Sequence, residues 1–311
     1  MPNLKVIFCG SGEFGLPTLR ALMAQHDIVQ VISQPDRPAG RGRGLTPTPI
    51  SQAAQSANLP LLCTANINQE TLPPADIMVV IAFGQKISDA IVHHPRLGSI
   101  NLHASRLPQY RGAAPINWAI IDGQKTSGNS VIRLAQKMDA GAILAQSELP
   151  IAPTETAGEL HDRLSQDGVA LVLRVLDQLA SGTAIELPQD ETRATLSPKL
   201  SRATAQLDFS QSAQQISQKI RGLYPWPGCR VKLCDAAGTE LARVRLARAT
   251  PGPSEGDRWQ PGEIMSDGAV QTGSGGVQIL ELQPESRAVM SLADYRRGYT
   301  WPPGAKLVSI E

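Results

Sequence analysis

Residues 97–112 read LGSINLHASRLPQYRG, and the expected architecture follows from this stretch. Ile100 and Leu102 alternate with polar residues, which predicts a short strand ending at His103. Asn101 and His103 then share one face of that strand, because successive side chains point to opposite faces. A strand that ends in a polar pair and runs into a loop is typical of the carboxyl edge of an open α/β sheet, where ligands bind.

The flanking segments predict the remainder of such a sheet. Residues 5–9 and 76–83 are apolar after their first residues, Lys5 and Asp76, and such runs are typical of buried parallel strands. Helical spacing in residues 17–25 followed by a strand at 28–32 completes a βαβ unit. Further helices are expected at 50–57, 88–93 and 159–181, and the last of them has an apolar face that includes Leu164, Leu171 and Val175. Several short strands, which indicate a small β-barrel, are expected at residues 230–233, 241–246, 262–265, 269–272 and 277–282. We predict a doubly wound, mostly parallel Rossmann-like sheet in residues 1–188, a linker at 189–207 and the barrel domain at 208–311.

Composition narrows the function classes. The net charge of +1 does not indicate a general nucleic-acid binder, and 4% aromatic residues disfavours stacking platforms for single strands. Cys9, Cys63, Cys229 and Cys234 are scattered, which predicts reduced thiols and no metal site. The longest strongly apolar run, residues 77–83, is too short to span a bilayer. We expect a cytoplasmic protein without a membrane segment.

Residues 10–15 read GSGEFG and match the Gly-x-Gly-x-x-Gly pattern of dinucleotide sites. An acidic residue should then end the second strand and bind the ribose hydroxyls. The chain instead continues Ser33-Gln34-Pro35, and Asp36 follows only after the proline. An NAD-dependent oxidoreductase therefore remains an alternative, while tight turning and close packing are the favoured reasons for the glycines.

Residues 34–49 read QPDRPAGRGRGLTPTP, and their prolines and glycines predict a loop without regular structure. Arg37, Arg41 and Arg43 make this loop basic, and guanidinium groups suit phosphates. Residues 34–49 are thus either a solvated insertion or a phosphate-binding loop.

Asn101, His103 and Asp139 supply an amide, an imidazole and a carboxylate, a set that suits acyl transfer to an amine. Asn101 can donate hydrogen bonds to a developing oxyanion. His103 can donate too, or carry a proton from the attacking nitrogen to the leaving one. Asp139, on a loop next to Gly141, can orient His103. Direct transfer through a tetrahedral intermediate then needs no Ser or Cys nucleophile, provided that Asp139 lies near His103.

Four motifs carry a resemblance to a known family: residues 34–42, NLHASRLPQYRGAAP at 101–115, MDAG at 138–141 and RGLYPWPG at 221–228. With these motifs the sequence resembles the methionyl-tRNA formyltransferase family over nearly the whole chain. The 101–115 and 138–141 motifs are shared by folate-dependent formyltransferases generally. The basic loop and the Pro-Trp-Pro segment are more specific to the tRNA enzymes.

The resemblance implies a formyl donor, N10-formyltetrahydrofolate, and an acceptor, the α-amino group of methionine on charged initiator tRNA, for translation initiation. It implies that Asn101, His103 and Asp139 are the catalytic residues and that a monomer is active. The implied folate-binding residues are Phe83, Gly84, Gln85, Ile87, Ser105, Arg106, Leu107 and Pro108. The implied tRNA-binding residues are Arg37, Arg41 and Arg43, and the C-terminal OB-like domain would bind the tRNA backbone through charge and shape.

The sequence departs from the family pattern at three places. Arg106 replaces a usual leucine, Gly44 replaces a usual lysine, and Ser11-Gly12 replaces a usual Thr-Pro.

Two further alternative functions stay open beside the oxidoreductase. One is formylation of another amine, such as a sugar nucleotide or a purine precursor, and the other is a non-catalytic RNA-binding protein.

Overall fold

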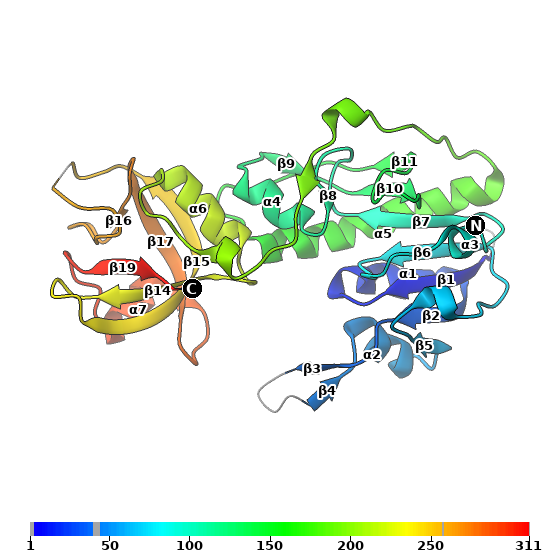
Figure 1. Cartoon of the computed structure of the whole chain (residues 1–311), viewed down its shortest axis with the longest axis horizontal. Coiled ribbons are helices and arrows are strands. Elements are labelled where there is room, and N and C mark those ends of the chain that lie inside the picture. The colour runs from blue at the N-terminus through cyan, green and yellow to red at the C-terminus, as the bar shows by residue number, and fades with distance from the viewer. Residues whose placement is uncertain (1–2, 40–43, 257, 311) are drawn as a thin grey trace. The chain divides into compact units, whose positions relative to one another are not determined.

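The computed structural model describes residues 3–39, 44–256 and 258–310, and Figure 1 shows its elements. The chain forms two compact units whose segments alternate along the sequence. The first unit comprises Met1–Gly112, Gly128–Leu149 and His161–Leu196, and the second comprises Ala113–Ser127, Pro150–Leu160 and Ser197–Glu311. The domain boundaries expected from the sequence, at residues 188 and 207, stay a prediction. The two units defined by contacts between residues alternate along the chain, so they are not separated at a single point.

The first unit contains a seven-stranded sheet in the order β11-β10-β7-β6-β1-β2-β5. Its strands are β1 (Lys5–Gly10), β2 (Asp27–Ser33), β5 (Leu61–Cys63), β6 (Ile77–Ile81), β7 (Ser99–His103), β10 (Ser130–Arg133) and β11 (Ile143–Gln146). Strands β5, β2, β1, β6 and β7 are parallel, whereas β10 and β11 are antiparallel to their neighbours. The chain runs outward from β1 to β5 and then returns to the other side of β1. This confirms the predicted doubly wound, mostly parallel sheet.

The helices of this unit occur where apolar spacing predicted them. They are α1 (Leu16–Gln25), α2 (Pro49–Ser56), α3 (Asp89–Val92) and α5 (Ala157–Ser181), with 3-10 turns η1 (Glu13–Gly15), η2 (Ile67–Gln69) and η3 (Glu191–Arg193). Leu164, Leu171, Val172 and Val175 of α5 are buried, so the expected apolar face is the face that packs.

Close packing accounts for the glycines that follow β1. A Cβ on Gly10 would lie 2.8 Å from the Phe8 ring and 2.9 Å from the Ile81 carbonyl oxygen, and one on Gly15 would lie 3.1 Å from the same ring. Strand β2 ends at Ser33, whose hydroxyl lies 2.6 Å from the Thr48 hydroxyl. Packing therefore explains the first and third glycines of the pattern, whereas a Cβ on Gly12 would meet only Ala82 at 3.6 Å; the end of β2 is bonded within the protein.

The basic segment contains regular structure, so the prediction that residues 34–49 lack it is wrong. Strands β3 (Arg37–Ala39) and β4 (Gly44–Thr46) form an antiparallel pair with Arg37 opposite Thr46 and Ala39 opposite Gly44. Pro38 is compatible with this ladder, because both strands of an isolated pair are edge strands and a missing N–H can face solvent there.

The second unit contains an antiparallel sheet in the order β16-β17-β15-β14-β19, with β18 also paired to β17. Its strands are β14 (Cys229–Cys234), β15 (Glu240–Gly252), β16 (Val270–Gln271), β17 (Gly276–Pro284), β18 (Met290–Ser291) and β19 (Lys306–Ser309). Single bridges join Glu263 to Lys306 and Ile264 to Val270. Residues 263–264 thus link both edge strands, which nearly closes the predicted OB-like barrel.

Helices α4 (Pro115–Ile121), α6 (Ala213–Gly222) and α7 (Leu292–Gly298) and the turn η4 (Ala203–Ala205) complete the second unit. Four two-residue strands lie elsewhere in the chain: β8 (Arg111–Gly112), β9 (Thr126–Ser127), β12 (Leu149–Pro150) and β13 (Leu196–Ser197). The strand expected at 262–265 does not form, because Gly262 adopts a left-handed conformation with φ +90 and only two residues after it make bridges.

The cysteines differ sharply in accessibility, which gives a direct test of the fold. Burial raises the pKa of the Cys9 thiol far above its ordinary value and raises the pKa of Cys229 to about 12, whereas Cys63 is exposed. Since the thiolate is the reactive form, we expect maleimide at pH 8 to modify Cys63 in the folded protein and to leave Cys9 and Cys229 intact. Peptide mass spectrometry would measure this, with urea-unfolded protein as the fully labelled control. Equal labelling of Cys9 and Cys63 in folded protein would contradict the fold.

Candidate active site

Strand β7 brings the first two predicted site residues to one edge of the sheet. Asn101 lies opposite Val80 of β6 and Ile132 of β10, and His103 lies opposite Ser130 of β10. His103 is only 7% exposed. Because the two residues are separated by one position on the strand, their side chains leave the same face.

The two ring nitrogens of His103 face different oxygens. Nε2 lies 2.9 Å from the carbonyl oxygen of Tyr110, and Nδ1 lies 3.7 Å from Oδ2 of Asp139. A carbonyl oxygen can only accept, so the ring hydrogen sits on Nε2 in this arrangement and Nδ1 faces the carboxylate. The assumption that Asp139 lies near His103 is confirmed, although 3.7 Å is too long for a hydrogen bond.

The backbone fixes the position of the Asp139 carboxylate. Gly112 donates its N–H to Oδ2 of Asp139 at 2.9 Å. Asp139 itself has φ +53, a left-handed conformation that is uncommon outside glycine. A Cβ on Gly141 would overlap the carbonyl oxygen of Arg133, so only glycine fits at that position of the turn. The sharp turn predicted from Gly141 is present, and Asp139 lies on it between β10 and β11.

Hydrogen bonds hold the loop after β7 against β10. Ser130 Oγ donates to the Ser105 carbonyl at 2.6 Å and accepts the N–H of Leu107 at 3.0 Å. Ser105 Oγ donates to the Gln109 carbonyl at 2.6 Å. Tyr110 then adopts φ +58 and presents its carbonyl oxygen to His103. Ser130 therefore shapes the loop, a role that cannot be read from its place in a predicted strand.

The predicted folate residues fall on two neighbouring segments. Residues 83–87 follow β6 and residues 105–108 follow β7, and these parallel strands are adjacent, so both segments leave the same edge of the sheet. Phe83 is buried, and Gln34 donates to its carbonyl oxygen at 2.7 Å. Gly84, with φ +76, lies against the same Gln34 side chain.

The side chains in these two segments differ in whether they are free to contact a ligand or are engaged within the protein. Gln85 accepts the N–H of Ile67 at 2.8 Å and donates to the Thr64 carbonyl at 2.7 Å, so its amide is engaged in the fold. Ile87 packs on the apolar core of the sheet. Arg106 is exposed and pairs with Glu148. The chain thus accommodates the unusual arginine at 106 by directing its charge to a surface carboxylate.

The predicted tRNA-binding arginines are only partly described. Arg37 is exposed on β3 and donates to Oε1 of Gln34. Arg41 and Arg43 lie outside the described residues.

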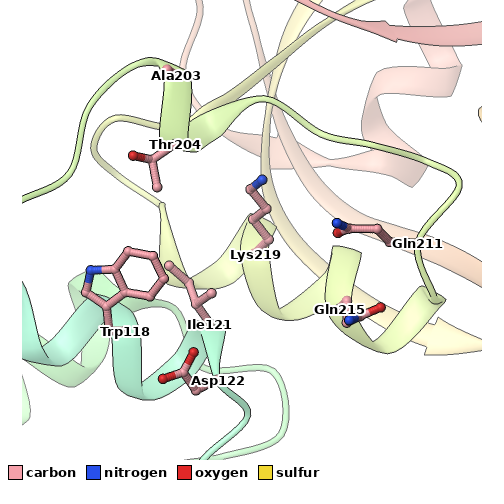
Figure 2. Close-up of a pocket in the computed structure, with 8 residues that line it drawn as sticks. All are labelled: Trp118, Ile121, Asp122, Ala203, Thr204, Gln211, Gln215 and Lys219. Atoms are coloured by element: carbon pink, nitrogen blue, oxygen red, sulfur yellow. The ribbon is translucent and has the colours of Figure 1, made fainter. Parts of the chain in front are cut away.

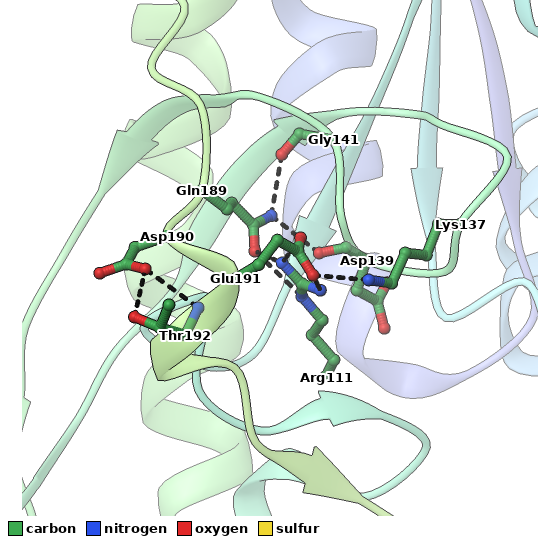
Figure 3. Close-up of polar contacts among 8 residues, drawn as sticks. All are labelled: Arg111, Lys137, Asp139, Gly141, Gln189, Asp190, Glu191 and Thr192. Carbon is green, nitrogen blue, oxygen red and sulfur yellow. Dashed lines mark hydrogen bonds and ion pairs between the residues drawn. The ribbon is translucent and has the colours of Figure 1, made fainter.

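A polar network next to Asp139 was not anticipated from the sequence. Arg111 is 4% exposed and bonds to Gln189 and Glu191, and Gln189 in turn bonds to the Asp139 backbone, as Figure 3 shows. Hydrogen bonds from Arg111 and Lys137 lower the pKa of Glu191 to about 2. Arg111 lies within the 97–112 stretch, but Gln189 comes from the predicted linker, and nothing local marks its contact with a residue 50 positions away.

A separate cavity lies within the second unit. Its volume is about 370 Å³, and its lining includes Trp118 of α4 and Gln215 and Lys219 of α6, as Figure 2 shows. Lys219 donates its ammonium to the Gln206 carbonyl at 2.6 Å. None of the predicted catalytic residues lines this cavity.

Across residues 3–39, 44–256 and 258–310, no helix is long and apolar enough to cross a membrane. In the same residues, no group of three or more His, Cys, Asp and Glu side chains is placed to hold a metal ion.

Comparison with known proteins identifies the family. The Formyl transferase family matches residues 4–176, and the Formyl transferase C-terminal domain family matches residues 199–300. A methionyl-tRNA formyltransferase of Gluconobacter oxydans is 37% identical over 98% of this chain and 100% of its own length. Another, of Acidobacterium capsulatum, is 38% identical over 98% of this chain and 99% of its own length.

A solved structure shares the fold at lower identity. The N-formyltransferase from Helicobacter canadensis, in complex with folinic acid and dTDP-3-aminofucose, has a TM-score of 0.65 and 15% identity over 90% of this chain and 99% of that one. The identity and coverage of the sequence relatives show that the chain is an enzyme that transfers a formyl group, and that it belongs to the methionyl-tRNA formyltransferase family.

Proposed function

We propose that this enzyme transfers the formyl group of N10-formyltetrahydrofolate directly to the α-amino group of methionyl initiator tRNA. A bond forms between the amino nitrogen and the formyl carbon, the bond between that carbon and N10 breaks, and the proton lost by the amine ends on N10. The observation that carries this proposal is the convergence of Asn101, His103 and Asp139 at one edge of the sheet, with 3.7 Å between His103 Nδ1 and the carboxylate.

Asn101 supplies the hydrogen-bond donors for the developing oxyanion. Among the residues that the structure describes, its side-chain amide has no hydrogen-bonding partner, so both donors are available. Donors fixed in advance at the point where charge develops are often the largest single contribution to catalysis. This supports Asn101 as the oxyanion ligand rather than as a structural residue.

His103 carries the proton between the two nitrogens. Its Nε2 is bonded to the Tyr110 carbonyl, which leaves Nδ1, beside Asp139, as the nitrogen that can accept a proton. The carboxylate then stabilises the imidazolium by its negative charge. A free α-amino group has a pKa of about 7.7–8.0, so much of the acceptor is already neutral near pH 7 and a strong base is not required.

The folate donor binds, in this proposal, between the segments after β6 and β7, which are residues 83–87 and 105–108. Phe83 packs in the apolar core beside the first segment, and the backbone of the 105–108 loop is held by hydrogen bonds to Ser130. The Helicobacter canadensis enzyme that shares the fold was solved with folinic acid, a formylated folate, which supports a folate donor here.

The tRNA acceptor is supported by the names of the relatives and by an unusual charge arrangement on the barrel. On β14 and β15, Arg230 lies opposite Arg245 and Lys232 lies opposite Arg243. Like charges directly opposite each other destabilise a sheet. Glu240 offsets part of this repulsion by pairing with Lys232 and Arg243. Phosphates of bound RNA would offset the rest, and we propose that residues 208–311 bind the tRNA through this face.

Arg230 offers a test of the RNA-binding face. Arg230→Gln is expected to weaken tRNA binding and to lower the slope of log Kd against log salt concentration by about 1, because one phosphate contact is lost. Arg230→Lys keeps the charge and should keep the slope. Filter binding at several salt concentrations measures both, and an unchanged slope in Arg230→Gln would exclude this face as a phosphate-binding surface.

The proposed reaction is tested with the purified full chain, N10-formyltetrahydrofolate and three acceptors: charged initiator tRNA, charged elongator methionine tRNA and an amino-sugar nucleotide. We expect rapid formylation of initiator tRNA only, with activity per molecule independent of protein concentration, as a cytoplasmic monomer would show. Preferential formylation of the sugar nucleotide would overturn the assignment of the acceptor but keep the chemistry. Tight binding of reduced nicotinamide would instead revive the oxidoreductase alternative.

A further inference from the structure

The chain that follows α5 lies along the edge of the first unit's sheet and reaches the candidate active site. We call residues 183–195 the strap. Leu187 and Ile143 of β11 exchange two backbone hydrogen bonds, at 2.7 and 2.9 Å. Glu186 pairs with Arg133 of β10 at 2.8 Å. The two backbone hydrogen bonds at Leu187 place the next residues of the strap beside the turn that carries Asp139.

Gln189 on the strap grips that turn through its backbone. Its amide nitrogen donates to the carbonyl oxygens of Asp139 and Gly141, both at 2.8 Å. Its amide oxygen accepts from Nη2 and Nε of Arg111, at 2.7 and 3.1 Å. Both donors and the acceptor of one side chain are therefore satisfied within the protein, as Figure 3 shows.

A second strap residue, Glu191, holds the same turn through Arg111 and Lys137. Glu191 accepts two hydrogen bonds from the buried Arg111, at 2.8 and 3.0 Å, and one from Lys137 at 2.5 Å. Lys137 precedes Asp139 on the turn. Asp139 is in a left-handed conformation, which persists only where surrounding contacts maintain it. The strap supplies such contacts on both sides of Asp139.

We propose that Gln189 is a positioning residue for formyl transfer: it holds the Asp139 backbone so that the carboxylate faces His103 Nδ1. This inference rests on the proposed function of the site. Gln189 touches neither His103 nor the position of the reacting atoms and acts only through Asp139. A mispositioning of about 1 Å in an active site can cost on the order of 100-fold in rate.

Gln189→Leu removes all four hydrogen bonds at similar volume. We expect kcat for initiator-tRNA formylation to fall about 10- to 100-fold, with the KM values for tRNA and folate little changed. Gln189→Glu keeps the Arg111 contact but sets an oxygen against two carbonyl oxygens, so it should also be impaired. The matched control is Glu186→Gln, which removes the charge of the Glu186–Arg133 ion pair, leaves the Gln189 contacts in place and should keep kcat within about twofold.

A second measurement does not depend on the reaction. Gly112 donates its N–H to the Asp139 carboxylate, so hydrogen exchange of the Gly112 amide, followed by NMR, reports the position of Asp139. Exchange should accelerate in Gln189→Leu and not in Glu186→Gln. If Gly112 exchange accelerates in Gln189→Leu but the wild-type protein formylates no tRNA, the proposed function is refuted and the role of Gln189 in positioning Asp139 stands. Unchanged Gly112 exchange in Gln189→Leu, or equal losses of kcat and Tm in both variants, would overturn the positioning role.

Discussion

Changing Asn101 to alanine is expected to lower kcat for formyl transfer by about 100- to 1000-fold, the usual cost of losing one oxyanion donor. The reason is geometric: the Asn101 amide leaves the same strand face as His103 and has no partner among the described residues, so its N–H groups are available to the oxyanion and alanine removes them. Single-turnover formylation of charged initiator tRNA measures the chemical step.

Asn101→Asp is the matched control for size. It keeps the shape of the side chain but replaces the donor nitrogen with an oxygen, so it should lose at least as much activity as the alanine variant. KM for both substrates should change little, since the interaction strengthens in the transition state. A kcat within a few-fold of wild type for either variant, in protein with unchanged Tm, would show that Asn101 is not the oxyanion ligand.

Changing Gly141 to alanine is expected to reduce both activity and stability. A Cβ at 141 would overlap the carbonyl oxygen of Arg133, which belongs to β10 and cannot move without disturbing the sheet. The turn must therefore shift, and it carries Asp139 with it. We expect about a 100-fold loss of kcat and a loss of about 1–3 kcal/mol in the free energy of unfolding.

Gly298→Ala provides the comparison for the Gly141 variant. Gly298 ends α7, and a Cβ there would have no neighbouring atom within 4 Å. That substitution should leave kcat unchanged and the midpoint of urea unfolding unchanged or slightly raised, because alanine restricts the unfolded chain. If Gly141→Ala behaved in the same way as Gly298→Ala, the turn would not constrain Asp139 as described.

The sheet could be predicted because burial imposes a simple pattern on its strands. Strand β6 (Ile77–Ile81) is apolar at every position and buried at every position. The periodic apolar face of α5 likewise indicated which side packs. Polar positions on β7 could be assigned to one face because strand geometry has a period of two. Asn101 and His103 can thus be placed from the sequence, and Gly141 places Asp139 on a loop, but the nearness of Asp139 to His103 is not visible in the sequence.

The features that could not be predicted depend on contacts between residues that are distant in the sequence. In the β3–β4 pair, Arg37, Pro38 and all three residues of β4 are exposed, so no apolar alternation marks these strands. Gln189 and Glu191 have the composition of a connector, and their roles arise from a fold that brings them to Arg111 and Lys137. A polar residue that satisfies backbone carbonyls from afar leaves no local trace in the sequence.

The alternation of the two units along the chain limits how the barrel can be exchanged between proteins. Helix α4 (Pro115–Ile121) belongs to the barrel's unit, and Asn117 donates to the Gly222 carbonyl of α6 at 2.7 Å. Trp118 and Ile121 pack on the barrel's apolar core. A chimaera that transplants only residues 208–311 would leave this helix behind and uncover part of that core. Recombination between relatives should therefore succeed only when the 113–127 insertion travels with its barrel.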